Sequence, residues 1–110
     1  MKVINRIKDN DEFVLTVKKG KTLKAPAYVV HFLRTDRNIC RIGLSVSKKI
    51  GNAVTRNRVK RQIRAMCDSL INYADHTFDI VIIARPEFLS SDFASNKQTL
   101  KSLLSEIGIN

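Results

Sequence analysis

One heptapeptide, residues 78–84 (Phe-Asp-Ile-Val-Ile-Ile-Ala), limits the possible folds of this chain most strongly. Six of its seven residues are apolar and do not alternate with polar ones, which is typical of a β-strand covered on both faces. Pro86 ends the strand, because proline has no backbone N–H to donate to a sheet. A strand covered on both faces needs neighbouring strands and packed helices, so the sequence predicts one sheet with helices against it.

Two earlier segments also carry strand patterns. Residues 27–34 are rich in β-branched and aromatic side chains, and Pro26 stands where the edge or start of a strand tolerates proline. In residues 40–47 one face is apolar and the other is small or polar, because the apolar side chains alternate at Cys40, Ile42, Leu44 and Val46. The short turn of residues 35–38 between these segments predicts an antiparallel hairpin.

Three segments carry helix patterns. The first follows Asp9, which can form a capping box with Glu12, and ends at Gly20, a residue suited to a left-handed stop. The second spans about residues 53–71, and its apolar stripe consists of Val59, Ile63, Met66 and Leu70. The third spans residues 91–107, with Ser91 or Asp92 as its cap and an apolar stripe of Leu100, Leu103, Leu104 and Ile107.

The element order α-β-β-α-β-α predicts an α+β fold, a two-layer α/β sandwich with room for one extra short strand before the hairpin. The 110 residues suit a single domain spanning residues 1–110, and the 44% apolar content supplies its core. Cys40 and Cys67 lie far apart, which indicates core packing in a reducing cytoplasm rather than a disulfide or a zinc site. We expect no membrane association, because no apolar run approaches the roughly 18 residues of a membrane span.

The positive charge of the chain is concentrated in one segment. The net charge of +10 arises from 20 Lys and Arg residues against 10 Asp and Glu residues. Residues 1–36 carry +4, residues 37–67 carry nine cations and no acidic residue, and residues 68–110 carry −3. Charge concentrated in this way indicates a surface for a polyanion, of which nucleic acid is the commonest inside cells.

The most informative part of that segment is the run of residues 48–64. It comprises a strand end, a turn containing Gly51, and a helix, with seven cations and no anion in total. Like charges on adjacent helical turns repel, so a helix without a binding partner normally includes glutamate. We therefore expect polyphosphate to supply the countercharge, and arginine suits this role because its planar guanidinium binds two oxygens. A solvated basic face without a partner is the simpler alternative.

The same run resembles the R-N-R signature of the bacterial ribonuclease P protein family, here Arg56, Asn57 and Arg58. The resemblance includes the preceding residues 43–49 and extends to residues 5–8, to the helix of Phe13, to Gly20 and to the strand 79–85. It therefore covers essentially the whole chain. It implies a mixed sheet with a left-handed β-α-β crossover, an exception to the right-handed rule.

The resemblance also implies a function. Members of the family bind a large catalytic RNA and, with it, remove the 5′ leader from precursor tRNA by endonucleolytic hydrolysis in the bacterial cytoplasm. Mg²⁺ would be bound mainly by the RNA, so we expect no catalytic residue, no metal ligand and no small-molecule cofactor in this chain. The residues implied to contact the catalytic RNA are Lys48, Lys49, Asn52, Arg56, Asn57, Arg58, Lys60, Arg61 and Arg64.

A second site implied by the resemblance is a cleft between the first helix and the open sheet face, which holds the single-stranded leader. Its residues would be Phe13, Val17, His31, Ser45 and Ser47. Single strands favour aromatic platforms and cations. Val17 and His31 stand where relatives often carry aromatic residues; the histidine can stack and can gain charge at mildly acidic pH, whereas the valine cannot stack. Phe13 has an alternative role as a core residue that holds the helix on the sheet.

Two other functions remain open on the sequence. A generic structured-RNA-binding or ribosome-associated module fits the composition, because phosphate contacts position a protein without reading sequence. A protein-only nuclease would need clustered carboxylates for metal ions or a histidine base. The acidic cluster of Asp9, Asp11 and Glu12 is better explained by helix capping, and His31 and His76 stand alone, so this second alternative has little support.

Overall fold

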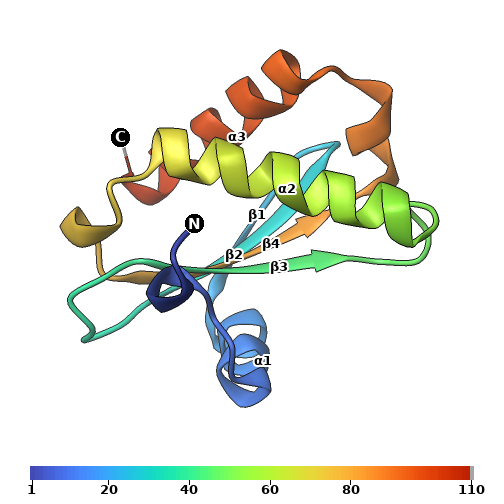
Figure 1. Cartoon of the computed structure of the whole chain (residues 1–110). Coiled ribbons are helices and arrows are strands. Elements are labelled where there is room, and N and C mark those ends of the chain that lie inside the picture. The colour runs from blue at the N-terminus through green and yellow to red at the C-terminus, as the bar shows by residue number, and fades with distance from the viewer. Residues whose placement is uncertain (110) are drawn as a thin grey trace.

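The structure, a computed structural model, describes residues 1–109. The sequence-based element order is confirmed, and the extra short strand is present as β1, which gives the order α-β-β-β-α-β-α. Three short 3₁₀ turns at Val3–Asn5, Tyr73–Asp75 and Pro86–Ser90 connect the main elements. The main elements are α1 (Asn10–Lys19), β1 (Lys21–Lys24), β2 (Tyr28–Arg34), β3 (Arg41–Val46), α2 (Ala53–Leu70), β4 (Phe78–Ala84) and α3 (Phe93–Ile107) (Figure 1).

The four strands form one mixed sheet in the order β1-β2-β4-β3. The predicted hairpin between the strands now called β2 and β3 is wrong, because β4 lies between them, antiparallel to β2 and parallel to β3. β4 takes this inner position because all its side chains except Asp79 are apolar, toward both faces, whereas β3 presents Arg41, Gly43 and Ser45 on one face. The local antiparallel pair of the chain is instead β1 with β2.

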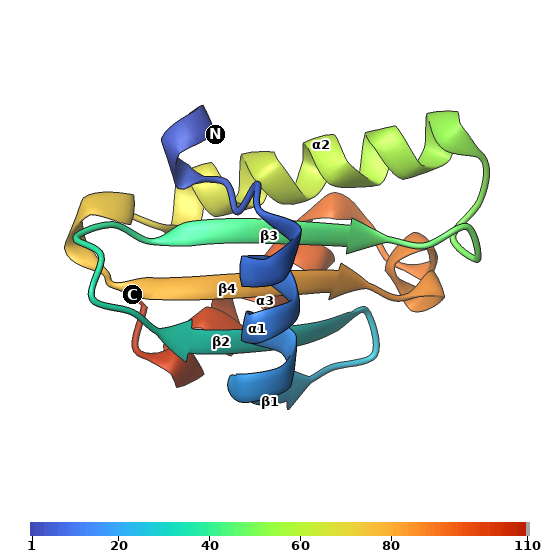
Figure 2. The same ribbon diagram turned by 90° about the horizontal axis from the view of Figure 1, so that it is seen from below.

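Helix α2 connects the parallel neighbours β3 and β4. Following the chain through Figures 1 and 2, the path leaves β3, returns along α2 on one side of the sheet and continues in β4 with a left-handed sense. The expected left-handed crossover is therefore confirmed. This path places α2 alongside the β3 edge of the sheet, with one flank facing away from the core (Figure 2).

The main core lies between the sheet and the pair α2 and α3, which cover the same face (Figure 1). Ile80 and Ile82 of β4 are fully buried in it. The predicted stripes supply its other side, with Val59, Ile63 and Met66 from α2 and Leu100, Leu103 and Leu104 from α3. The two-layer sandwich is thus formed as expected, and α1 adds a partial third layer on the opposite face of the sheet (Figure 2).

The boundaries of α1 differ from the expected details. Asp9 caps the helix by accepting a hydrogen bond from the backbone N–H of Asp11, but Glu12 forms no capping box and reaches toward arginines instead. Gly20 ends the helix with φ −75° and ψ 167°, so it is not the predicted left-handed stop. Glycine is required there for space, since a Cβ would lie 2.5 Å from the carbonyl oxygen of Thr16.

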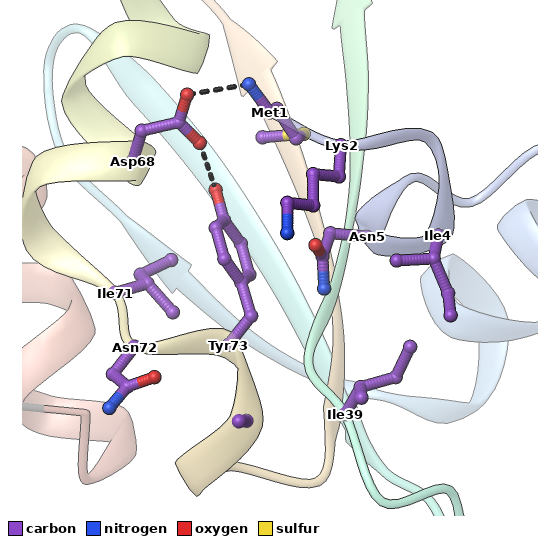
Figure 3. Close-up of a pocket in the computed structure, with 10 residues that line it drawn as sticks. Met1, Lys2, Ile4, Asn5, Ile39, Asp68, Ile71, Asn72 and Tyr73 are labelled. Carbon is purple, nitrogen blue, oxygen red and sulfur yellow. Dashed lines mark hydrogen bonds and ion pairs between the residues drawn. The ribbon is translucent and has the colours of Figure 1, made fainter.

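The segment before α1 packs against the C-terminal end of α2. The α-amino group of Met1 lies 2.6 Å from a carboxylate oxygen of Asp68, whose other oxygen accepts a hydrogen bond from Tyr73 (2.8 Å; Figure 3). These residues border a cavity of about 510 Å³. Further along, Arg6 forms a parallel bridge with Ile42, so this segment runs beside the β3 edge of the sheet.

Both cysteines are buried in the core, as expected. Burial raises the pKa of the Cys40 thiol to about 12 and also raises the pKa of Cys67, so neither forms a thiolate near neutral pH. Within residues 1–109, no helix has the length and apolar character needed to span a membrane.

Candidate nucleic-acid interface

The basic helix α2 begins after a glycine turn. The side chain of Asn52 caps the helix by accepting a hydrogen bond from the backbone N–H of Thr55 at 3.0 Å. Gly51 has φ +154°, a value that other residues rarely adopt. The apolar stripe then faces the core, and the remaining circumference of the helix faces solvent. The local sequence therefore fixes both where α2 starts and which side it presents.

The seven cations of the run 48–64 remain uncompensated by the chain. Lys48, Lys49, Arg58 and Arg61 are exposed, whereas Arg56, Lys60 and Arg64 are half-buried. Among the residues that the structure describes, none of the seven lies within ion-pair distance of a carboxylate. The charge that the sequence placed here is therefore available to a partner.

Two other arginines of the same acid-free segment are not available. The guanidinium of Arg41 donates to Asp79 (Nε–Oδ1 3.0 Å, Nη2–Oδ2 2.7 Å) and to Glu12 (Nη2–Oε2 2.7 Å). Arg37 also pairs with Glu12 and lies 3.3 Å from Asp79. The hydrogen bond from Arg41 holds the pKa of the Glu12 carboxyl below its ordinary value, and the carboxylates raise the pKa of Arg41. The nine cations of residues 37–67 thus reduce to seven free ones.

Three of the free cations on α2 line two separate depressions. Lys60 and Arg64 line a notch of about 130 Å³ beside the β3 edge. Arg58 borders a separate depression of about 230 Å³ together with Phe88 and Phe93. At 100° per residue, Arg58 lies further round the helix than Lys60 and Arg64, which agrees with this division.

Arg6 was not among the predicted site residues, yet it lines the same notch as Lys60 and Arg64. It donates a hydrogen bond to the carbonyl of Met1, while its Nε is buried without a partner, as is the Nε of Arg56. The resemblance at residues 5–8 was the available signal for Arg6. No periodicity connects it with α2, because the contact depends on the N-terminal segment running beside β3.

Four of the five residues predicted for the leader cleft lie on the α1 face of the sheet, namely Phe13, Val17, His31 and Ser45. Phe13 packs on Gly43, where a Cβ would lie 2.9 Å from its ring, so Phe13 does hold α1 on the sheet. The strand register aligns Gly43 with Val81 and Val81 with His31. Ser45 follows two residues after Gly43 and so shares its face. Val17 is half-buried one turn after Phe13, and Ser47 is exposed beyond the end of β3.

The surroundings of His31 favour its neutral form. Its Nδ1 lies 2.9 Å from the hydroxyl oxygen of Thr22, and burial together with nearby Lys24 lowers its pKa. These surroundings disfavour the charged form, so charge on His31 would need a lower pH than for an ordinary histidine, and its gain of charge at mildly acidic pH stays a prediction. Stacking remains open to the ring.

The fold and this site define a class. A small α+β domain whose crossover helix carries cations without carboxylate partners is a nucleic-acid-binding protein, since a phosphate backbone supplies the missing countercharge.

The comparisons with known proteins specify the family. The Ribonuclease P family model matches residues 1–108. The ribonuclease P protein component of Bacillus cereus is 43% identical over 99% of this chain and 96% of its own length, and that of Mesoplasma florum is 40% identical over 89% and 90%. The structure is similar to the RNase P protein of Staphylococcus aureus (TM-score 0.83, 33% identity, 96% of each chain) and to that of Thermotoga maritima (TM-score 0.78, 32% identity, 92% and 96%). The chain belongs to the ribonuclease P protein family.

Proposed function

We propose that this chain, as the protein subunit of the ribonuclease P ribonucleoprotein, binds the catalytic RNA through α2 and promotes removal of the 5′ leader from precursor tRNA in the bacterial cytoplasm. Family membership supports the RNA partner and the endoribonuclease role. The observation that carries the proposal is the set of seven cations without carboxylate partners on and before α2. Binding of RNA would relieve the repulsion among these charges. It would also release the counterions that surround the phosphates.

Within this interface the residues divide by task. The arginines can each bind two phosphate oxygens, and the lysines add single charges. Lys60, Arg64 and Arg6 converge on one notch and would hold a phosphate jointly. Asn52 already uses its side-chain oxygen as the cap of α2, so its contribution would be mainly to set the start of the helix.

The α1 face would hold the leader. Val17, His31 and Ser45 are half-buried there, close to the Phe13–Gly43 contact. Because Phe13 packs on the sheet and the surroundings of His31 favour its neutral form, this face would offer mainly apolar and polar contacts. That combination suits a single strand whose backbone is neutralised elsewhere.

Mg²⁺ does not fit the donors of this chain. In residues 1–109 no group of three or more His, Cys, Asp or Glu side chains converges as a metal site. Glu12 and Asp79, which lie close together, are engaged by Arg37 and Arg41. We therefore assign Mg²⁺ mainly to the RNA, and the protein would act by neutralising phosphate and positioning substrate.

Reconstitution tests the proposal. The protein should raise cleavage of precursor tRNA by a bacterial ribonuclease P RNA at low Mg²⁺, and absence of any gain would reject the role. Cleavage by the protein without RNA would favour a nuclease instead. Equal affinity for ribosomal RNA fragments and ribonuclease P RNA would favour a generic RNA-binding module.

A further inference from the structure

A second basic segment, separate from α2, lies between Glu12 and Asp36. It contains five cations and no acidic residue, namely Lys18, Lys19, Lys21, Lys24 and Arg34. In the part of the chain that the structure describes, none of these cations is within ion-pair distance of a carboxylate. Like α2, this segment therefore offers charge that the protein itself does not neutralise.

The fold gathers three of these cations around one groove of about 430 Å³. Lys19 ends α1, Lys21 begins β1 and Arg34 ends β2, and all three line the groove. Its wall is aromatic, since Phe32 and Phe78 pack edge to face with ring centroids 6.1 Å apart. One carboxylate, Glu106 of α3, also lines it, so cations outnumber acids by three to one.

Arg34 lies over the ring of Phe78 at this groove. Its guanidinium carbon lies 4.9 Å from the centroid of the Phe78 ring, a cation–π arrangement. Phe78 is only 9% exposed, so the ring supports the guanidinium from the protein side. Arg34 itself is exposed, so a ligand can reach its guanidinium, and stacking on arginine is one of the ways proteins hold unpaired bases.

The groove is distant from the interface on α2. The sheet order β1-β2-β4-β3 places β1 and β3 at opposite edges, and α2 runs along the β3 side (Figure 2). One phosphate cannot contact both surfaces. A ligand in the groove must therefore be a different molecule or a different segment of a long one.

We propose that this groove binds single-stranded RNA, with one base stacked on Arg34 and the flanking phosphates on Lys19 and Lys21. An inorganic anion would use the lysines but not the aromatic wall. An apolar peptide would use the wall but leave the three cations unpaired. A nucleotide uses both, and a groove of about 430 Å³ falls within the usual size of ligand sites. The site lies outside the interface assigned above and stands independently of it.

The test uses the full chain with the α2 interface silenced by Lys60→Ala, Arg61→Ala and Arg64→Ala. In this background, a five-nucleotide oligouridylate should shift the NMR signals of the Arg34 side chain and the Phe78 ring. Adding Lys21→Ala and Arg34→Ala should weaken its affinity at least tenfold. Arg34→Lys, which keeps the charge but removes the plane, should lose most of that affinity. The amide spectrum of each variant verifies folding.

A matched control removes two cations elsewhere, Lys97→Ala and Lys101→Ala on α3, and should change the affinity less than twofold. Signal changes confined to α2 or to the α1 face would overturn the proposal. So would inorganic phosphate that binds as tightly as the oligonucleotide, because stacking would then contribute nothing.

Discussion

Two groups of arginines from one acid-free stretch of sequence differ in the folded protein, because one group is paired with carboxylates and the other is not. Arg37 and Arg41 are tied to Glu12 and Asp79, which come from α1 and β4. The arginines of α2 have no such partners in the described residues. Two groups of arginines with the same charge pattern in the sequence can therefore have different functions. What separates the two groups is whether the fold brings a carboxylate from a distant part of the chain.

The physical difference lies in burial. Asp79 is 3% exposed on the inner strand of the sheet, and a carboxylate in such a place needs a cationic partner. Arg41 supplies it, and by also binding Glu12 it fastens α1 to the sheet. The α2 cations have no carboxylate beside them in the described residues: Arg58 and Arg61 are exposed to water, and Arg56, Lys60 and Arg64 are half-buried. Arg37 and Arg41 thus stabilise the fold, and the cations of α2 remain available to bind a polyanion.

The largest expected effect concerns the free group. Combining Lys60→Ala, Arg61→Ala and Arg64→Ala should reduce affinity for ribonuclease P RNA by about 2000-fold, at roughly 1.5 kcal/mol for each charge-assisted contact. For the wild-type chain, about five neutralised phosphates predict a slope of log affinity against log salt of roughly −3.5 to −4.5. The triple variant should flatten this slope by about three. Filter binding over a salt series measures both.

The same triple variant should keep its thermal stability or gain a little, since it removes repulsion on one helix. A clear loss of stability would show that these cations stabilise the fold, as Arg41 does, and would contradict the difference proposed between the two groups.

Replacing Arg41, which is paired, should lower the stability of the protein and leave its RNA affinity almost unchanged. Arg41→Ala leaves Asp79 buried with a weaker partner in Arg37, so we expect a loss of about 3 kcal/mol in unfolding free energy. Urea denaturation measures this loss. Under conditions where the variant is still folded, its affinity for the RNA should change less than threefold. The double variant Arg41→Met with Asp79→Leu should recover most of the stability, because no charge is then left buried.

Asn52 combines a structural role with a place in the predicted interface, because it caps α2 among the cations. Asn52→Ala should cost about 1 kcal/mol of stability through loss of the cap. Asn52→Asp keeps the cap but adds a carboxylate among the cations, so stability should hold while RNA affinity falls. Asp92→Ala, which removes the cap of α3 away from this surface, is the matched control. Equal RNA affinity for Asn52→Asp and wild type would place Asn52 outside the interface.

The smallest expected effect concerns Glu12, whose pairing with arginines should make the stability of the protein depend on pH. The folded protein lowers the pKa of Glu12 from its ordinary value of 4.5, so its contribution is present above pH 4.5 and is lost as pH falls through the folded value. Glu12→Gln should therefore be less stable than wild type at pH 7, by about 0.5 kcal/mol for a partly exposed pair. The difference should vanish at low pH. A constant difference across pH would mean that packing, not charge, is responsible.

Much of the architecture was predictable from sequence because it depends on local patterns. The apolar stripe of Val59, Ile63 and Met66 defined the buried side of α2, and the mainly apolar run of residues 78–84 identified β4 as a strand covered on both faces. The β2–β3 hairpin prediction failed because adjacency in sequence was taken for adjacency in space, while β4 inserted between the two strands. Glu12 was assigned to a capping box on spacing alone, but arginines from β3 and the preceding loop compete for it.

The sequence by itself determined the elements, the basic helix and the family, since helical period, turn residues and the R-N-R run are all read within a few residues of one another. Only the tertiary structure decided which cations are free, that Arg6 joins Lys60 and Arg64, and that Lys19, Lys21 and Arg34 surround an aromatic groove. Each of those outcomes depends on contacts between residues far apart along the chain. No local pattern encodes such contacts, because they arise from how strands order themselves when their apolar faces are buried together.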